Sequence, residues 1–274
     1  AGSLVYDSAP LAASVEIAGF PRVRLRARAD TKLLHWMVRL EDVAPDGRVS
    51  LVGGGALNGA QRKSRLQPEY LKPGETMLLE VPLHFTTWTF RPGHRNRLAV
   101  SNALFPMLWP TPYSATSELD VGSADTWLEL PVIPKKQQPV PAFLPSQPRE
   151  HRLDARRLEF DDAQRINRVT RDAPGRTTVE WDQEYGYQLA GGRYHIYQKS
   201  TYRTSDRDPA ASSFEGSNWT EMELTSGRKL RVESWAEIRS DATHFHFTFT
   251  RRIFENSAQV RERTWKDSVA REFQ

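Results

Sequence analysis

Polar and apolar residues alternate one by one through much of the second half of this chain. Residues 231–238 read Arg-Val-Glu-Ser-Trp-Ala-Glu-Ile, and residues 244–250 read His-Phe-His-Phe-Thr-Phe-Thr. A period of two places successive side chains on opposite faces of a β-strand. Helical periods are scarce, while β-branched and aromatic residues are common. The sequence therefore predicts an all-β protein.

In the second half, the alternating runs are long and evenly spaced. We expect them to form consecutive antiparallel strands, in an up-and-down sheet that is curved or partly closed. Hairpin turns are expected at residues 225–227 and 255–257. The expected strands are residues 176–181, 194–202, 218–224, 229–238, 243–253 and 259–265.

In the first half, the runs are shorter and their connections are longer. Turns are expected at residues 45–47, 72–75 and 91–94, each of which contains Pro followed by Gly within two residues. Seven or eight strands with long loops at 58–68 and 102–125 favour a jelly-roll sandwich over a meander. The expected strands are residues 14–17, 22–29, 34–43, 50–52, 77–81, 97–101 and 127–132.

Proline is dense between the two halves. A chain segment of this kind cannot donate ladder hydrogen bonds and prefers an extended conformation, so it predicts a semi-rigid linker. We expect a jelly-roll β-sandwich over residues 1–134, a linker over 135–148 and an antiparallel β-domain over 149–274. The prolines are Pro131, Pro134, Pro139, Pro141, Pro145 and Pro148.

Composition limits the chemistry that the chain can perform. Cysteine is absent, which excludes disulfides, a thiol nucleophile and Cys-ligated metal sites. The sequence has no apolar run of 18 residues and no signal-peptide pattern at its start, so we expect a cytoplasmic protein that does not bind a membrane. It begins almost directly in a folded pattern, as a fragment of a longer chain would.

The net charge of +4 is small and the charges are well mixed. Arg22, Arg24, Arg26 and Arg28 alternate with apolar residues and share one face of an expected strand. A nucleic-acid-binding stripe and a solvated sheet face with acidic neighbours both fit this pattern. We favour the solvated face, because no aromatic-plus-glycine RNA motif accompanies the arginines, and we expect no nucleic-acid partner.

Several short motifs of the first half match one protein family in order and spacing. The most specific are Val-Arg-Leu-Glu-Asp-Val-Ala-Pro-Asp-Gly at 38–47 and Phe-Arg-Pro-Gly-His-Arg at 90–95. With residues 4–11, 15–25 and 71–74, they resemble the C-terminal domain of the cocaine-esterase and X-Pro dipeptidyl-peptidase family of serine hydrolases. From about Arg149 the chain resembles an extra β-domain found in some members, through residues 184–187, 241–246 and 263–271.

This resemblance implies a galactose-binding-like jelly roll that packs on an α/β-hydrolase domain of the same parent chain. The family's Ser-His-Asp triad would lie in that missing N-terminal domain, and no G-x-S-x-G nucleophile elbow occurs here. No catalytic residue, cofactor or metal is therefore assigned. The implied role is to brace the hydrolase domain and to form part of its substrate cleft. The alternative is a β-module that binds carbohydrate or another small ligand, since jelly rolls commonly host such sites.

One loop is too apolar for an ordinary surface connection. Residues 105–110 read Phe-Pro-Met-Leu-Trp-Pro. Either the loop covers one end of the sandwich core, or Phe105, Met107 and Trp109 form an interface or cleft wall against the missing domain. Trp88, in a run of threonines, is a candidate sugar-stacking platform, although sharing a strand face with Phe90 favours a place in the core.

Four other patterns are expected to have no chemical role. His244 and His246 share a strand face, but the sequence places no third metal ligand beside them, and Phe245, Phe247 and Phe249 are expected to mark the core side. Gly53, Gly54 and Gly55 lack the Lys-Ser or Lys-Thr of a phosphate loop and predict a bulge or turn at a strand end. The carboxylate pairs that a glycosidase would need have no visible cleft; they are Glu180 with Glu184 and Asp161 with Asp162.

Overall fold

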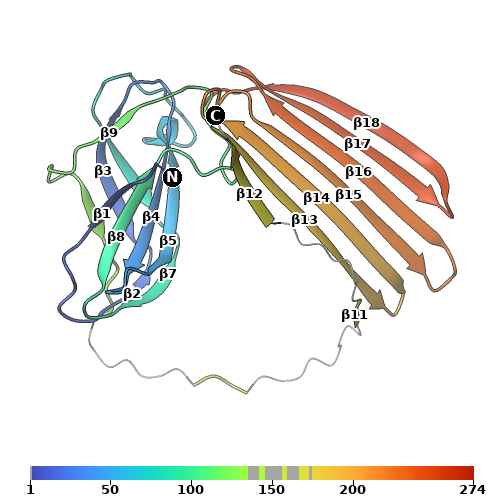
Figure 1. The fold of residues 1–274 in the computed structure, drawn as a ribbon, viewed down its shortest axis with the longest axis horizontal. Helices are drawn as coiled ribbons and strands as arrows, with labels where there is room; N and C mark the ends of the chain where they lie inside the picture. The colour runs from blue at the N-terminus through green and yellow to red at the C-terminus, as the bar shows by residue number, and fades with distance from the viewer. Residues whose placement is uncertain (1, 135–141, 146–155, 159–166, 173–174) are drawn as a thin grey trace. The chain divides into compact units, whose positions relative to one another are not determined.

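The computed structural model describes residues 2–134, 142–145, 156–158, 167–172 and 175–274. The chain divides into two compact units. The first unit comprises Ala1–Pro139 with Phe273–Gln274, and the second comprises Val140–Glu272. Figure 1 colours the strands of the first unit blue to green and those of the second yellow to red. Of the expected linker at 135–148, only residues 142–145 lie within the described residues.

The first unit is built from short antiparallel strands in separate sheets. One sheet has the order β1 (Leu4–Asp7), β8 (Arg95–Ser101), β4 (His35–Val43) and β5 (Val49–Asn58). A second has the order β10 (Trp127–Glu129), β3 (Arg22–Ala29) and β6 (Met77–Pro82), with β9 (Ser117–Leu119) also on β3. A third pairs β2 (Val15–Gly19) with β7 (Thr86–Phe90).

The core of the first unit collects the apolar positions of these alternating strands. Val23 and Leu25 of β3 are each 1% exposed, while the arginines between them point outward. Trp36 and Phe90 are fully buried in the same cluster, which draws on β2 to β8. Burying one large apolar side chain contributes about 1.5–3 kcal/mol, so this cluster dominates the stability of the unit. The expected all-β sandwich is confirmed, and its jelly-roll topology stays a prediction.

The structure tests two expectations about single strands of the first unit, one about the arginines of β3 and one about the three consecutive glycines. The solvated-face interpretation of the β3 arginines is confirmed, because each pairs with an acidic residue. The bulge expected at the three glycines is confirmed by a register shift beside Gly53, opposite Leu40 and Glu41, but its expected place at a strand end is wrong, because the glycines lie inside β5. Gly55 passes so close to Pro82 that a Cβ there would collide with the carbonyl oxygen of Pro82. The close approach of β6 therefore requires a glycine where strand propensity alone would end the strand.

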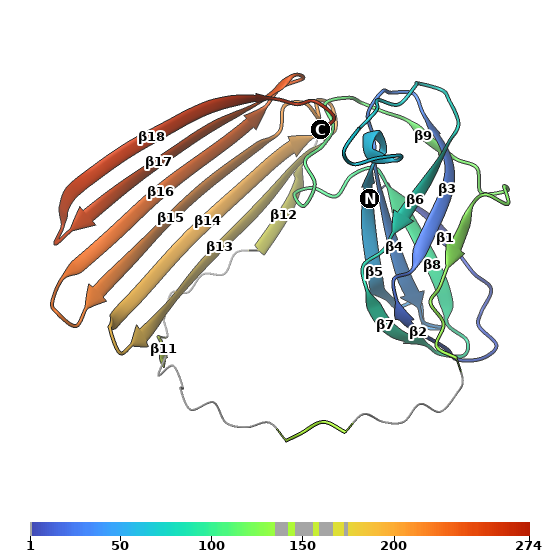
Figure 2. The ribbon, with the colours of Figure 1, turned by 180° about the vertical axis from the view of Figure 1, so that it is seen from behind.

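The second unit is an antiparallel sheet whose six long strands follow one another in chain order (Figures 1 and 2). The expected curved up-and-down sheet is confirmed. Two short strands, β11 (Arg156–Leu158) and β12 (Asn167–Asp172), pair with the first long strand. The long strands are β13 (Arg176–Leu189), β14 (Gly192–Ser205), β15 (Ser213–Leu224), β16 (Lys229–Ser240), β17 (His244–Glu255) and β18 (Ala258–Ala270).

Both expected hairpin turns are present in this sheet. Gly227 has φ +80° between β15 and β16, a conformation that glycine adopts without strain. Asn256 and Ser257 both have positive φ, as the two-residue turn between β17 and β18 requires. These tight turns fix the register of neighbouring strands. Within the described residues, no helix is long and apolar enough to span a membrane.

The long sheet has an apolar face that is only partly buried. Phe247 lies opposite Ile238, and Phe249 lies between Ala236 and Trp265, so these residues share a face. All of them are partly or fully exposed, although Phe245, Phe247 and Phe249 were expected to mark a core. The alternation is as predicted, but the apolar positions of this face are not fully buried as a core would be.

Candidate functional site

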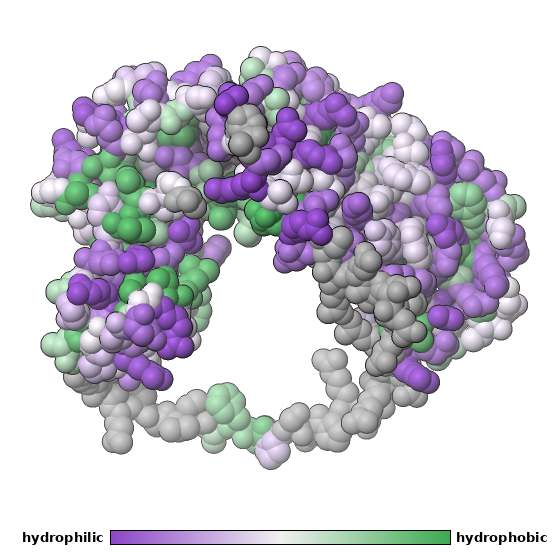
Figure 3. Space-filling view, in the orientation of Figure 1, coloured by the Kyte–Doolittle hydropathy of each residue, from purple (hydrophilic) through white to green (hydrophobic). Residues whose placement is uncertain are grey.

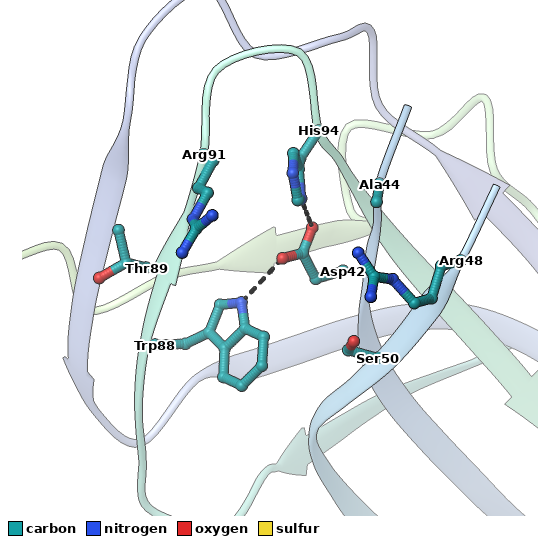
Figure 4. Close-up of a pocket in the computed structure, with 8 residues that line it drawn as sticks. All are labelled: Asp42, Ala44, Arg48, Ser50, Trp88, Thr89, Arg91 and His94. Carbon is teal, nitrogen blue, oxygen red and sulfur yellow. Dashed lines mark hydrogen bonds and ion pairs between the residues drawn. The ribbon is translucent and has the colours of Figure 1, made fainter. Parts of the chain in front are cut away.

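A pocket of about 560 Å³ opens on the first unit, beside the end of β4 and the end of β7, which belong to different sheets (Figure 4). Its lining comes from three segments that are distant in sequence but adjacent in the sandwich. They are the end of β4 with the turn after it, the start of β5, and β7 with the turn that follows. The lining residues are Asp42, Ala44, Arg48, Ser50, Trp88, Thr89, Arg91 and His94.

Asp42 is the polar centre of this pocket. It lies near the end of β4 and is only 5% exposed. The Trp88 indole nitrogen donates a hydrogen bond to Asp42 Oδ2 over 3.0 Å, and His94 Nδ1 lies 2.8 Å from Asp42 Oδ1. A buried carboxylate is stable only when hydrogen bonds or charges compensate its lost hydration. Asp42 therefore joins β4 to β7 and to the turn that carries His94.

Local sequence explains how these partners reach Asp42. Trp88 is held on β7 by packing against the sandwich core. The Arg-Pro-Gly-His turn after β7 contains Gly93 at φ +81°, and His94 N–H donates to the carbonyl of Arg91. The turn places the His94 ring over the carboxylate, as Figure 4 shows. One strand and one turn thus bring two donors to one acceptor.

The mouth of the pocket is cationic. Arg48 and Arg91 are both exposed there. Arg48 has a long ion pair with the exposed Asp46, at 3.7 Å, and Arg91 forms no ion pair with a described residue. Both Asp42 oxygens already accept hydrogen bonds, so the charged and aromatic groups left for a ligand are two guanidiniums and the face of an indole, beside the hydroxyl groups of Ser50 and Thr89. This chemistry suits a planar or anionic ligand.

The pocket does not have the geometry of a serine-hydrolase triad. An Asp–His pair is present, and Ser50 lies opposite Asp42 in the β4–β5 ladder. Figure 4 shows Ser50 on the far side of Asp42 from His94. A nucleophilic serine would have to contact the other nitrogen of the imidazole. The arrangement can bind and can fix strands, but it does not activate Ser50.

The predicted interface loop follows β8 and lies elsewhere on the first unit. Met107 is 79% exposed, while Phe105 and Trp109 are partly buried and meet edge to face with ring centroids 6.2 Å apart. Leu108 N–H donates to the Leu104 carbonyl, which closes a turn under Met107. The structure thus places Phe105 and Met107 in one turn, with Met107 at its tip, and packs Trp109, just after the turn, against Phe105.

The loop is tied to the sandwich at its first residue. Asn102 donates to the carbonyl of His35 over 2.8 Å and accepts a hydrogen bond from Ser117. These contacts connect the loop to β4 and to β9. The turn at 104–108 is therefore carried on a fixed base, as a preformed contact surface would be.

The histidines of β17 form ordinary hydrogen bonds. His246 Nε2 lies 2.8 Å from Asp241 Oδ2, and Asp241 Oδ1 accepts the N–H groups of Thr243 and His244. These hydrogen bonds, that of His246 above all, hold the pKa of Asp241 far below its usual range. Among the described residues, no group of three His, Asp or Glu side chains is placed to hold a metal ion.

The carboxylate pair proposed for glycosidase chemistry is not a pair in space. Glu180 and Glu184 lie four residues apart on β13, which separates them by roughly 13 Å along an extended strand. Glu184 instead lies 2.6 Å from His195 Nε2, and Glu180 is 3.9 Å from Arg168. Asp161 and Asp162 lie outside the described residues.

Sequence reasoning missed the Asp42 pocket, although it singled out every segment that forms it. Asp42 and His94 stand in the two most specific motifs, and Trp88 was considered as a stacking platform. The missing information was that β4 ends beside β7. One observation could have indicated it: Asp42 continues the strand face of Trp36, Val38 and Leu40, so a donor from another segment was required to satisfy it.

Comparison with known proteins gives these features a context. The family model described as the X-Pro dipeptidyl-peptidase C-terminal non-catalytic domain matches residues 1–164. A proposed serine esterase of Mycobacterium bovis is 34% identical, and the match covers 36% of this chain and 19% of that protein. The cocaine esterase of a Rhodococcus species is 29% identical, over 38% of this chain and 18% of that protein.

Solved structures show a similar partial match. The selenomethionine-labelled α-amino acid ester hydrolase aligns with a TM-score of 0.46 and 27% identity, over 48% of this chain and 25% of its own. The chain spans about a fifth of the length of the curated relatives it matches.

Proposed function

Because this chain belongs to the family of X-Pro dipeptidyl-peptidase C-terminal non-catalytic domains, we propose that it is the accessory region of a larger serine hydrolase. In this proposal the first unit braces an N-terminal α/β-hydrolase domain of the same parent chain. The turn at 104–108, with Phe105, Met107 and Trp109, meets that domain and forms part of the wall of its substrate cleft. The parent would cleave an ester or an X-Pro peptide bond.

The observation that carries this proposal is the exposed side chain at the tip of an otherwise ordered apolar turn. Met107 is 79% exposed, yet the turn below it is closed by a backbone hydrogen bond and anchored through Asn102. An apolar group held out on a rigid base gains stability only when a partner covers it. Methionine adapts well to an irregular partner surface.

The test compares Met107→Ser in the 274-residue chain and in the full-length parent enzyme. Exposed substitutions usually change stability by no more than about 0.5 kcal/mol, so we expect the Tm of the chain to change by less than about 2 °C. In the parent enzyme the same change removes a buried contact of about 1.5–3 kcal/mol, so its thermal inactivation should occur several degrees lower. Leu66→Ser is the matched control, since Leu66 is apolar and 94% exposed and belongs to a different loop, between β5 and β6.

Equal effects of Met107→Ser and Leu66→Ser on the parent enzyme would contradict the interface. A large loss of stability in the isolated chain would show instead that the turn only caps the sandwich core.

A second candidate function rests on the Asp42 pocket. The indole of Trp88 beside two exposed guanidiniums favours a small planar or acidic ligand, such as a sugar acid, over a neutral sugar. The test is a titration of the chain with glucuronate and with glucose, followed by tryptophan fluorescence. Saturable binding of glucuronate that is lost in Arg91→Ala, but retained in Arg193→Ala on the second unit, would support it. Equal responses to both sugars would exclude it.

A further inference from the structure

The last strand of the second unit, β18 (Ala258–Ala270), forms an open edge of the long sheet. It pairs with β17 on one side, and all 13 of its residues are exposed. No described strand pairs with its outer side. Figures 1 and 2 both show it at the margin of the sheet. An edge of this length presents a row of unpaired backbone donors and acceptors, which can pair with another chain.

The charged side chains of this edge are incompletely paired. Glu262 forms an ion pair with Arg252 of β17 at 3.0 Å, and Arg263 lies over the Trp265 ring at 4.8 Å. Arg261, Lys266 and Asp267 form no ion pair with a described residue. Figure 3 shows mostly hydrophilic residues on the visible face of this unit. Charges on an edge strand can simply discourage aggregation, but that role requires no particular order of signs.

The order of signs along β18 is complementary to itself. We place β18 antiparallel to β18 of a second copy, with a two-fold axis through Thr264. Arg261 then lies opposite Asp267 of the second copy, and Glu262 lies opposite Lys266. Arg263 lies opposite Trp265, where its guanidinium can contact the ring. The symmetry produces each pair twice.

Other registers lack this property. In an antiparallel ladder, two residues opposite one another point their N–H groups the same way, either both toward the partner strand or both away from it. This direction alternates along a strand, so in a symmetric pair of identical strands the two-fold axis must pass through a residue and not between two residues. An axis through Arg263 creates no pair of opposite charges, and an axis through Trp265 creates one kind, Arg263 with Asp267. An axis through Glu262 places Arg261 opposite Arg263, which is repulsive. A β-bulge at Val260 separates the first residues of β18 from the regular ladder that begins at Arg261, and the register centred on Thr264 pairs residues 261–267 of both copies within that ladder.

We propose that this chain forms a two-fold symmetric dimer by antiparallel pairing of β18 with β18 of a second copy, centred on Thr264. The pairing joins the two long sheets into one continuous sheet and satisfies the exposed backbone groups of both edges. Residues opposite one another in a ladder share a face, so Trp265 lies at the seam on the same face as Arg263 and Asp267 of both copies. This inference goes beyond the accessory role and does not depend on it.

Charge reversal tests the partner and the pairing. Sedimentation equilibrium of the 274-residue chain should show a monomer–dimer equilibrium. Arg261→Asp or Asp267→Arg alone turns an attractive pair into a repulsive one twice per dimer, and should raise the dimer Kd at least tenfold. The double variant restores opposite charges and should return the Kd to within threefold of the original. Arg207→Asp, the same charge change in an exposed turn, is the control and should leave the Kd unchanged.

Cysteine cross-linking tests the register. The chain has no cysteine, so each variant carries a single thiol. Thr264→Cys places the two sulfurs on the axis, with Cβ atoms about 4.5–5.5 Å apart, and should form a disulfide-linked dimer under mild oxidation. In the Val260→Cys dimer the two thiols lie eight residues apart along the strands, roughly 26 Å, so this variant should form no disulfide-linked dimer. Unchanged circular dichroism shows that each variant folds.

The proposal is overturned by a chain that stays monomeric at hundreds of micromolar. It is equally overturned if neither single charge reversal changes the dimer Kd, or if the Kd of the double variant stays as high as those of the single variants. Cross-linking of Val260→Cys as fast as Thr264→Cys would exclude the register.

Discussion

Replacing Asp42 by Asn should destabilise the first unit far more than the loss of an exposed carboxylate does. Asn has the same shape as Asp, so the change opens no cavity and removes only the charge and one acceptor. Asp42 is 5% exposed and accepts hydrogen bonds from Trp88 and His94. In the variant one of these donors faces an amide N–H₂ group and loses its acceptor.

The expected cost follows from the two hydrogen bonds. A hydrogen bond to a charged group contributes about 1.5–3 kcal/mol, and an unsatisfied buried donor costs about 1–3 kcal/mol. We therefore expect a loss of about 2–4 kcal/mol, which lowers the Tm of a unit of this size by roughly 6–15 °C. Trp88→Phe removes one donor and leaves the other, so it should cost less.

Differential scanning calorimetry of the 274-residue chain measures the effect, and Glu129→Gln is the matched control. Glu129 also accepts hydrogen bonds from one partner residue, Arg22, but its side chain is 53% exposed. An exposed ion pair contributes about 0–1 kcal/mol, so the Tm of this variant should lie within about 4 °C of that of the unsubstituted 274-residue chain. If Asp42→Asn lowers the Tm no more than Glu129→Gln does, Asp42 does not join the strands in the way described.

Three further outcomes are expected. Gly55→Ala should destabilise the first unit by about 1–3 kcal/mol in urea unfolding, because its Cβ meets the Pro82 carbonyl, whereas Gly53→Ala, with nothing nearer than 3.9 Å, should be tolerated. Asp241 has a folded-state pKa below its ordinary value of 3.8, so its stabilising contribution is present above that pH and is lost as the pH falls below it; Asp241→Asn should therefore make unfolding of the second unit less dependent on pH between about 5 and 2. The chain alone should hydrolyse neither p-nitrophenyl esters nor X-Pro arylamides above the buffer rate; turnover that survives repurification and labelling by a fluorophosphonate would contradict this.

The alternation of side chains was sufficient to predict the second unit. Each of the six long strands there pairs with the next in sequence, so local turns such as the one at Asn256 also determine the topology. The first unit was harder, because β4 pairs with β8 and β3 with β6, β9 and β10. These pairings depend on packing between distant segments, which a single sequence does not encode locally.

The same distinction explains what was found and missed at the candidate sites. Phe105, Met107 and Trp109 are neighbours in sequence, so their place at one turn and its end could be anticipated from their apolar character. Asp42 and His94 are 52 residues apart, and their pairing depends on the fold. Gly55 was misplaced for a similar reason, since its purpose is visible only when β6 lies beside it.

The accessory role is tested most directly by the protection of Met107 in the full-length parent enzyme. Limited oxidation with hydrogen peroxide, followed by mass spectrometry, gives the rate of sulfoxide formation at each methionine. Met107 is 79% exposed in this chain, and Met37, at 6%, is an internal control for an intact fold. The proposed interface predicts that Met107 oxidises at least tenfold more slowly in the parent enzyme than in the isolated chain, with Met37 slow in both. Equal rates for Met107 in the two proteins would contradict the account.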